Sequence, residues 1–386
     1  MPWPSARLLL VSALVLGACD AADPAPATPP SAPPADATAA LFDDAFRGLA
    51  PADADAEPAV SKGGYTVETI DYDPAYDGPQ AERRDLQLYL PTGRKPYPWV
   101  LYVHGGGYQK VNPHRGHDVA LGLVREGYAV ALVGYRLSPG VGQAFDPDRI
   151  RHPDHVRDLA AATRWMVDHA SEYGMHPHRR ALIGHSSGAH LASVLLANPT
   201  FLAEQGLRTS DWDAAVLLDG LGYRIDDTIW RFRGAMPDYS RGVFGVDRVR
   251  QRPAGARPVG YNAGALYDVA SEDSAEPSGA WLYPELTSGP GEPEAYAAPH
   301  ALNLSPYYNA AAGDPVAPVL TVYGTAPGRR HSAEQFRDVV LTNAGVAASF
   351  ASGLTHNQHV TLFDGYSVKA QAYRQAVVGW LTAHVR

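Results

Sequence analysis

One short segment limits the fold more than any other, because an apolar run passes through two glycines into a helical pattern. The run Ala181-Leu182-Ile183 is followed by Gly184-His185-Ser186-Ser187-Gly188, and residues 189–197 are rich in Ala and Leu. The order is therefore strand, sharp turn, helix. The flanking glycines let strand and helix approach without a Cβ clash, so that Ser186 is presented at the carboxyl edge of a sheet.

Short apolar runs alternate with longer helical patterns over much of the remaining chain, which indicates βαβ units and a mostly parallel sheet. We expect eight strands, at residues 66–72, 85–90, 99–103, 129–133, 181–183, 214–218, 319–323 and 347–350. Amphipathic patterns predict helices around residues 157–167 and at residues 368–385. The last helix should cover one face of the sheet.

The composition excludes several classes of protein. The apolar fraction of 45% and the charged fraction of 19% are ordinary for a packed domain. The chain carries 32 basic and 41 acidic residues, a net charge of −9, and no cluster of Lys or Arg, so no nucleic-acid partner is expected. Its single cysteine can form neither an internal disulfide nor a cysteine-based metal site.

That cysteine ends an N-terminal targeting segment. The apolar run from Leu8 to Leu16 follows Arg7 and is shorter than the roughly 20 residues that span a bilayer. The run closes in Leu16-Gly17-Ala18-Cys19, which resembles the bacterial lipoprotein box. We expect residues 1–18 to be a signal peptide and Cys19 to carry a lipid, giving an exported, membrane-anchored bacterial lipoprotein. The alternative is an ordinary signal peptide with an incidental thiol, and the choice of inner or outer membrane is open.

Three regions follow the expected cleavage site. We expect residues 19–60 to form the lipid anchor and a linker rich in Ala and Pro. The linker has too few large apolar side chains to offset the conformational entropy lost on ordering. Residues 61–386 form the folded domain. Within it, an insertion at about 223–317 separates the sixth and seventh strands, and connections of that length are often lids or binding elements.

A second glycine-rich turn, His104-Gly105-Gly106-Gly107, follows the strand expected at 99–103. In acyl transfer the carbonyl oxygen becomes an oxyanion, and amide donors about 2.7–3.1 Å away stabilise it by several kcal/mol. The amides of Gly105, Gly106 and Ser187 stand at the sequence positions of such donors. The alternative is a glycine turn with a purely structural role.

These segments together resemble the α/β-hydrolases of the hormone-sensitive-lipase, small carboxylesterase and kynurenine-formamidase group. The residues that carry the resemblance are His104-Gly105-Gly106-Gly107-Tyr108, Tyr135-Arg136-Leu137-Ser138-Pro139, Pro153, Asp158, Arg164-Trp165 and Gly184-His185-Ser186-Ser187-Gly188-Ala189-His190-Leu191. The resemblance covers about residues 65–222, and 318–386 more loosely. It implies the α/β-hydrolase fold, an eight-stranded, mostly parallel sheet flanked by helices, a serine nucleophile, and scaffold roles for Asp158 and Trp165.

A serine hydroxyl needs a histidine base and an acid that fixes the tautomer of that histidine. Two histidines, His356 and His359, follow the last expected strand. Family members often carry glycine, two residues and histidine, which favours His356. Many also carry histidine, an apolar residue and Ser or Thr, which favours His359, the residue that we prefer. A metal site at this pair is not expected, because no third ligand accompanies it.

The acid departs from the family pattern. Relatives place an aspartate after the seventh strand, but here residues 324–328 contain no carboxylate. Asp219 directly follows the sixth expected strand and keeps the order serine, acid, histidine. We therefore assign the acid to Asp219. The alternatives are that Asp219 only starts a turn, or that the site is a weakened pair of serine and histidine.

The resemblance implies hydrolysis of small or medium carboxylic esters through an acyl-enzyme at Ser186, with no metal or cofactor. Hydrolysis of an aryl formamide is the nearest alternative chemistry. A different hypothesis is a binding lipoprotein that kept the fold and lost turnover, because the acid after the seventh strand is missing. The partners expected are a small ester or amide and, through the anchor, a membrane. Substrate, acyl length and oligomeric state stay open.

The anchor can be tested directly. If Cys19 is lipidated, Cys19→Ser should move the protein from the membrane fraction to the soluble exported fraction, because a lipid chain is what holds it. Fractionation and immunoblotting measure this. Retention of the variant in the membrane fraction would contradict lipidation at Cys19.

Overall fold

The computed structural model describes residues 64–110, 116–139, 148–225, 243–244, 305–325, 327–363 and 365–385. The expected signal peptide, Cys19 and the linker lie outside these ranges, as does most of the expected insertion at 223–317. Within these ranges, no helix combines the length and the hydropathy that a membrane span requires.

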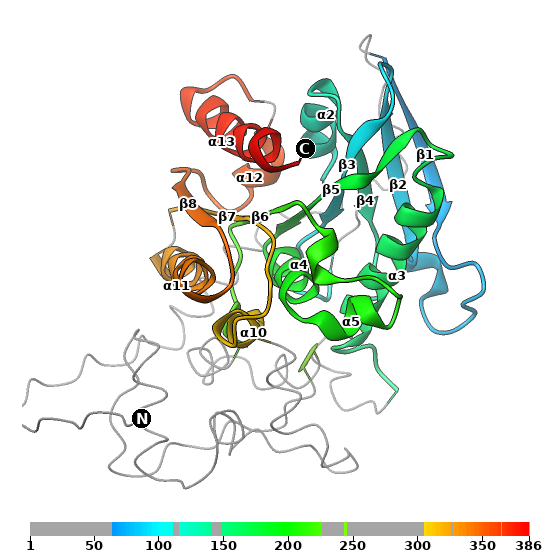
Figure 1. The fold of residues 1–386 in the computed structure, drawn as a ribbon, viewed down its shortest axis with the longest axis horizontal. Helices are drawn as coiled ribbons and strands as arrows, with labels where there is room; N and C mark the ends of the chain where they lie inside the picture. Colours follow the sequence, from blue (N-terminus) through cyan, green and yellow to red (C-terminus); the bar gives the residue numbers. More distant parts are fainter. Residues whose placement is uncertain are drawn as a thin grey trace, which may run out of the picture. The chain divides into compact units, whose positions relative to one another are not determined.

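The described residues build one eight-stranded sheet (Figure 1). Its strands are β1 (Tyr65–Asp71), β2 (Asp85–Pro91), β3 (Tyr97–Val103), β4 (Ala129–Val133), β5 (Met175–His185), β6 (Ala214–Leu218), β7 (Val319–Tyr323) and β8 (Ala347–Ala351). They lie in the order β1-β2-β4-β3-β5-β6-β7-β8. Only the pairings of β2 with β1 and with β4 are antiparallel. The predicted mostly parallel sheet of eight strands is confirmed.

Continuous apolar runs explain the central strands, because a parallel strand is covered on both faces. Every residue of β4 and of β6 is buried, whereas most of β1, at the edge, is exposed. Strand β5 begins earlier than the predicted 181, because Met175 already pairs with Tyr97 across a register shift. Residues 176–180 are His-Pro-His-Arg-Arg, so no apolar run predicts this first part of the strand.

Helices cover both faces of the sheet. One core contains side chains of α3 (Asp154–His169), α4 (Ser187–Ala197), α10 (Pro306–Ala311) and α11 (Pro327–Asn343). The other core contains side chains of α2 (His117–Arg125) and α13 (Val368–His384), so the last helix covers one face as predicted. The shorter helices are η1 (Ala81–Arg83), α5 (Pro199–Ala203), η4 (Thr209–Asp211) and α12 (Gln358–Thr361).

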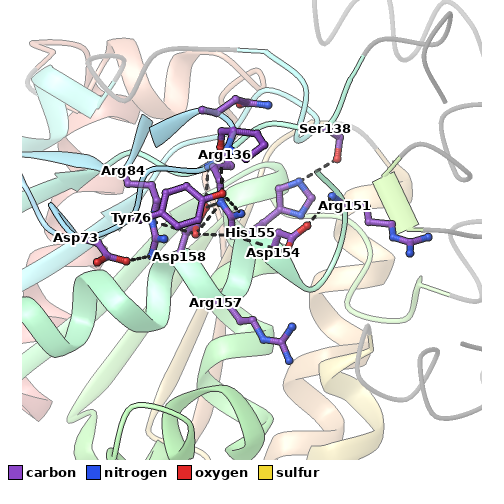
Figure 2. Close-up of polar contacts among 12 residues, drawn as sticks. Asp73, Tyr76, Arg84, Arg136, Ser138, Arg151, Asp154, His155, Arg157 and Asp158 are labelled. Carbon is purple, nitrogen blue, oxygen red and sulfur yellow. Dashed lines mark hydrogen bonds and ion pairs between the residues drawn. The ribbon is translucent and has the colours of Figure 1, made fainter. Parts of the chain in front are cut away.

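A buried ion cluster ties α3 to the segment after β4 (Figure 2). Asp158 on α3 is fully buried and accepts hydrogen bonds from the backbone amide of Arg136 at 2.9 Å and from its guanidinium at 2.9–3.1 Å. The guanidinium of Arg84 lies 3.4 Å from the same carboxylate. Two residues beyond Arg136, the amide of Ser138 donates to the carbonyl of Tyr108 at 2.8 Å. Asp158 thereby supports the glycine-rich turn that ends at Tyr108.

We expect Asp158→Asn to lower the free energy of unfolding by about 1–3 kcal/mol, because it removes the only fully buried countercharge of this cluster. Arg84 then keeps Asp73, and Arg136 keeps Asp154, and both of these carboxylates are partly exposed. Urea unfolding measures the change. The matched control is Asp168→Asn on the same helix, where an exposed carboxylate pairs with Arg164 and a loss of about 0–1 kcal/mol is expected. Equal losses in the two variants would contradict the scaffold role of Asp158.

Candidate active site

Ser186 stands in the turn between β5 and α4, in the predicted order of strand, turn and helix. Its backbone has φ 56° and ψ −122°, a conformation that an L residue rarely adopts and that surrounding structure must hold. The amide of Ser186 donates to the carbonyl of Leu218 at 2.9 Å. The serine is thus fixed at the carboxyl ends of β5 and β6.

Three side chains from distant parts of the chain meet at this edge. The imidazole Nε2 of His356 lies 3.0 Å from the hydroxyl oxygen of Ser186. The other ring nitrogen, Nδ1, lies 2.6 Å from Oδ2 of Asp219. With Nδ1–H donating to the carboxylate, Nε2 is free to accept the proton of the serine hydroxyl. The arrangement can therefore turn Ser186 into a nucleophile.

The preference for His359 over His356 is corrected by this geometry. The imidazole of His359 is fully buried, and its Nε2 lies 2.8 Å from the hydroxyl of Ser352, not beside Ser186. His356 lies on the loop before the short helix α12, and His359 lies within that helix. Sequence spacing could not tell which of the two faces the serine, because the backbone path of that loop decides it.

Asp219 follows β6 and lies beside the end of β7. Its backbone amide donates to the carbonyl of Val322 at 2.6 Å, and its Oδ1 accepts from the amide of Gly324 at 2.8 Å. A Cβ built on Gly324 would lie 2.4 Å from the carbonyl oxygen of Leu354 and 3.3 Å from Oδ1 of Asp219. The position directly after β7 thus has no room for a side chain, and the carboxylate comes from the neighbouring strand.

Arg329 on α11 is a site residue that sequence reasoning missed. Its Nε lies 3.4 Å from Oδ2 of Asp219, and its guanidinium also donates to the backbone carbonyl of that residue. Burial alone would raise the pKa of Asp219, but the charge of Arg329 and the hydrogen bond from His356 outweigh it and lower that pKa. No local motif marks Arg329, since only the packing of α11 brings it to the carboxylate.

The same environment keeps the imidazole neutral. Burial and the positive charge of Arg329 lower the pKa of His356 to about 4, against the opposing effect of Asp219. Above that pH the ring is uncharged and able to accept a proton.

The turn after β3 lies against the serine. A Cβ built on Gly105 would lie 2.8 Å from Cβ of Ser186, so only glycine fits there. The ring of His104 contacts the carbonyl of Gly105, with Nδ1 2.7 Å from the oxygen. Because a trans peptide points its N–H away from its C=O, this contact turns the amide of Gly106 to the other side.

The amides predicted for the oxyanion all belong to this edge. Within the described part of the chain, no hydrogen bond engages the N–H of Gly105 or Gly106. Ser187 is the first residue of α4, where backbone N–H groups lack partners inside the helix and the helix dipole favours negative charge. The amide of Tyr108 lies 3.4 Å from the hydroxyl of Ser187, which links the two turns. The role of the Gly105, Gly106 and Ser187 amides as oxyanion donors stays a prediction.

A metal site is not apparent in the described ranges, where no group of three or more His, Cys, Asp or Glu side chains could hold an ion.

Comparison with known proteins gives a partial sequence match. Residues 86–205 match the family model described as BD-FAE. Kynurenine formamidase of Danio rerio is 33% identical over 119 residues, which are 31% of this chain and 36% of the relative. Ethyl acetate hydrolase of Pseudomonas putida is 35% identical over 115 residues, which are 28% of this chain and 33% of the relative. The matched part spans about a third of the length of these two relatives.

Solved structures share the fold over most of the chain. Esterase B from Lactobacillus rhamnosis covers 90% of this chain and 91% of its own, with a TM-score of 0.56 and 17% identity. A bacterial heroin esterase covers 85% and 87%, again with a TM-score of 0.56 and 17% identity. These similarities identify the sheet and its flanking helices as an α/β-hydrolase fold.

The influence of Arg329 on His356 predicts a shift in titration. Arg329→Gln removes a positive charge that opposes protonation of the ring, so the pKa of His356 should rise from about 4 toward its ordinary value. NMR titration of the His356 ring protons measures this. Arg330→Gln is the matched control, because Arg330 is exposed and pairs with Glu334. An unchanged midpoint in Arg329→Gln would contradict the assigned electrostatics.

Proposed function

We propose that this chain, which belongs to the α/β-hydrolase superfamily and is related to its carboxylesterases and kynurenine formamidases, hydrolyses small or medium carboxylic esters. The observation that carries the proposal is the pair of contacts made by His356, 3.0 Å to the hydroxyl of Ser186 and 2.6 Å to the carboxylate of Asp219. The matched relatives and structural neighbours that are named as ester hydrolases support it.

In the proposed reaction, Oγ of Ser186 attacks the ester carbonyl carbon while its proton passes to Nε2 of His356. The carbonyl oxygen becomes an oxyanion that accepts hydrogen bonds from the amides of Gly105, Gly106 and Ser187. The bond to the alcohol oxygen then breaks, and that oxygen takes the proton from His356. Water, deprotonated by the same imidazole, attacks the acyl-enzyme, releases the acid and restores Ser186.

Aryl formamide hydrolysis is the second candidate, favoured by the similarity of residues in the matched region to kynurenine formamidase. The same groups would serve both reactions, because each passes through a tetrahedral oxyanion and differs in the leaving group. The hypothesis of a binding protein without turnover loses its main support, since the absence of an acid after β7 is compensated by Asp219.

Ser186→Ala should abolish hydrolysis of p-nitrophenyl butyrate and labelling by a fluorophosphonate probe, because both need the serine oxygen. Absorbance of the released p-nitrophenol measures hydrolysis, and in-gel fluorescence measures labelling by the probe. Ser193→Ala, a buried serine further along α4 that donates to the carbonyl of His190, is the matched control and should keep both. Comparing N-formyl anilides with esters ranks the two chemistries. Undiminished turnover in Ser186→Ala would end the proposal.

Asp219→Asn should lower kcat by about 10⁴-fold in protein that still folds, because the amide no longer fixes the tautomer of His356. Tm is measured beside kcat, so that a loss of folding is recognised. Asp338→Asn, at an exposed carboxylate on α11, is the control and should leave kcat unchanged. An unaltered rate in Asp219→Asn would move the orienting role to another group.

A further inference from the structure

The backbone of His356 is held by two other imidazoles. Nε2 of His185 lies 3.0 Å from the carbonyl oxygen of His356, and Nδ1 of His359 lies 3.3 Å from the same oxygen. The rings of His185 and His356 also stack, with centroids 4.5 Å apart at 30°. His185 precedes the nucleophile in the elbow, so this contact joins segments 171 residues apart.

Both contacts require the imidazole to be the donor. A carbonyl oxygen only accepts, so His185 must carry its proton on Nε2 and His359 on Nδ1. Nε2 of His359 is then an acceptor for the hydroxyl of Ser352, at 2.8 Å. The same hydroxyl also lies 3.0 Å from the carbonyl oxygen of Tyr323. Its single proton can serve only one of these two acceptors. We assign it to the ring, because that carbonyl still accepts the backbone amide of Ser352 at 3.0 Å.

Burial keeps these two rings in the neutral form that such donation requires. His185 and His359 are 6% and 0% exposed, and burial is the main cause that lowers the pKa of each. The hydroxyl of Tyr373 on α13 donates to the carbonyl of His359 at 2.9 Å, which fixes that residue to the covering helix.

We propose that His185 and His359 are positioning residues, which clamp the carbonyl of His356 so that its ring spans the distance between Ser186 and Asp219. The inference rests on the proposed role of His356 as the base. The nucleophile elbow, through His185, and the layer that contains α13, through His359, thus set the same loop. A peptide unit with both lone pairs of its oxygen occupied cannot rotate without losing two hydrogen bonds.

The test separates the donor from the shape of each ring. His185→Phe and His359→Phe keep a flat ring and remove the donor. His185→Gln and His359→Asn return an amide N–H near the original donor nitrogen. His178→Phe, at an exposed position on β5, is the matched control for the substitution itself. Tm is measured for every variant, so that loss of folding is recognised.

Two measurements are made on each variant. The first is the far-downfield proton resonance of the hydrogen bond between His356 and Asp219, which is identified by its loss in Asp219→Asn. The second is kcat and KM for p-nitrophenyl butyrate. We expect both Phe variants to lose the resonance and to lower kcat by about 10- to 100-fold at nearly constant KM, because a displaced base misses the serine. The Gln and Asn variants should recover both properties.

A retained resonance and kcat in folded Phe variants would overturn the clamp, as would amide variants that are as impaired as the Phe variants. Failure of the proposed function looks different. In that case the unaltered protein fails to hydrolyse the ester, whereas the resonance still reports whether His185 and His359 position His356.

Discussion

The burial of one carboxylate organises the whole site. Asp219 is 1% exposed, and a buried charge is costly unless several donors surround it. The donors come from three separate elements, which are the amide of Gly324 after β7, the imidazole of His356 after β8, and the guanidinium of Arg329 on α11. Loss of any one of them leaves the carboxylate short of a partner. The loops at this edge of the sheet are therefore stable only as a set.

Arg329 lowers the pKa of two neighbouring groups, a carboxyl and an imidazole. Its positive charge lowers the pKa of Asp219, which keeps the acid ionised, and it lowers the pKa of His356, which keeps the base neutral. A base with a low pKa is a weaker proton acceptor, yet its protonated form is a stronger acid. In the proposed reaction this favours protonation of the leaving alcohol. The carboxylate of Asp219 stabilises the imidazolium that forms when Ser186 loses its proton.

The sequence predicted the parts of the molecule that depend on local pattern. The eight strands and the turn at Ser186 follow from apolar runs and glycine positions, which are visible within a few residues. The choice between His356 and His359 depends on the path of a loop fixed by contacts from β5 and α13, and no local pattern encodes that path. The contact of Arg329 with Asp219 could not be predicted for the same reason, because the two residues are 110 positions apart in the chain.

The position of the acid follows from the order of the strands. Ser186 follows β5 and Asp219 follows β6, while His356 follows β8, so the loop that carries His356 must cross the end of β7. The backbone of that loop is held there by a hydrogen bond from the amide of Thr325 to the carbonyl of Leu354, at 3.1 Å. A side chain on Gly324 would collide with that same carbonyl. Because neighbouring strands are only about 4.8 Å apart, moving the acid by one strand keeps it within reach of the imidazole. The loop that brings His356 to the site therefore requires a glycine after β7, and the aspartate after β6 supplies the carboxylate that this glycine cannot.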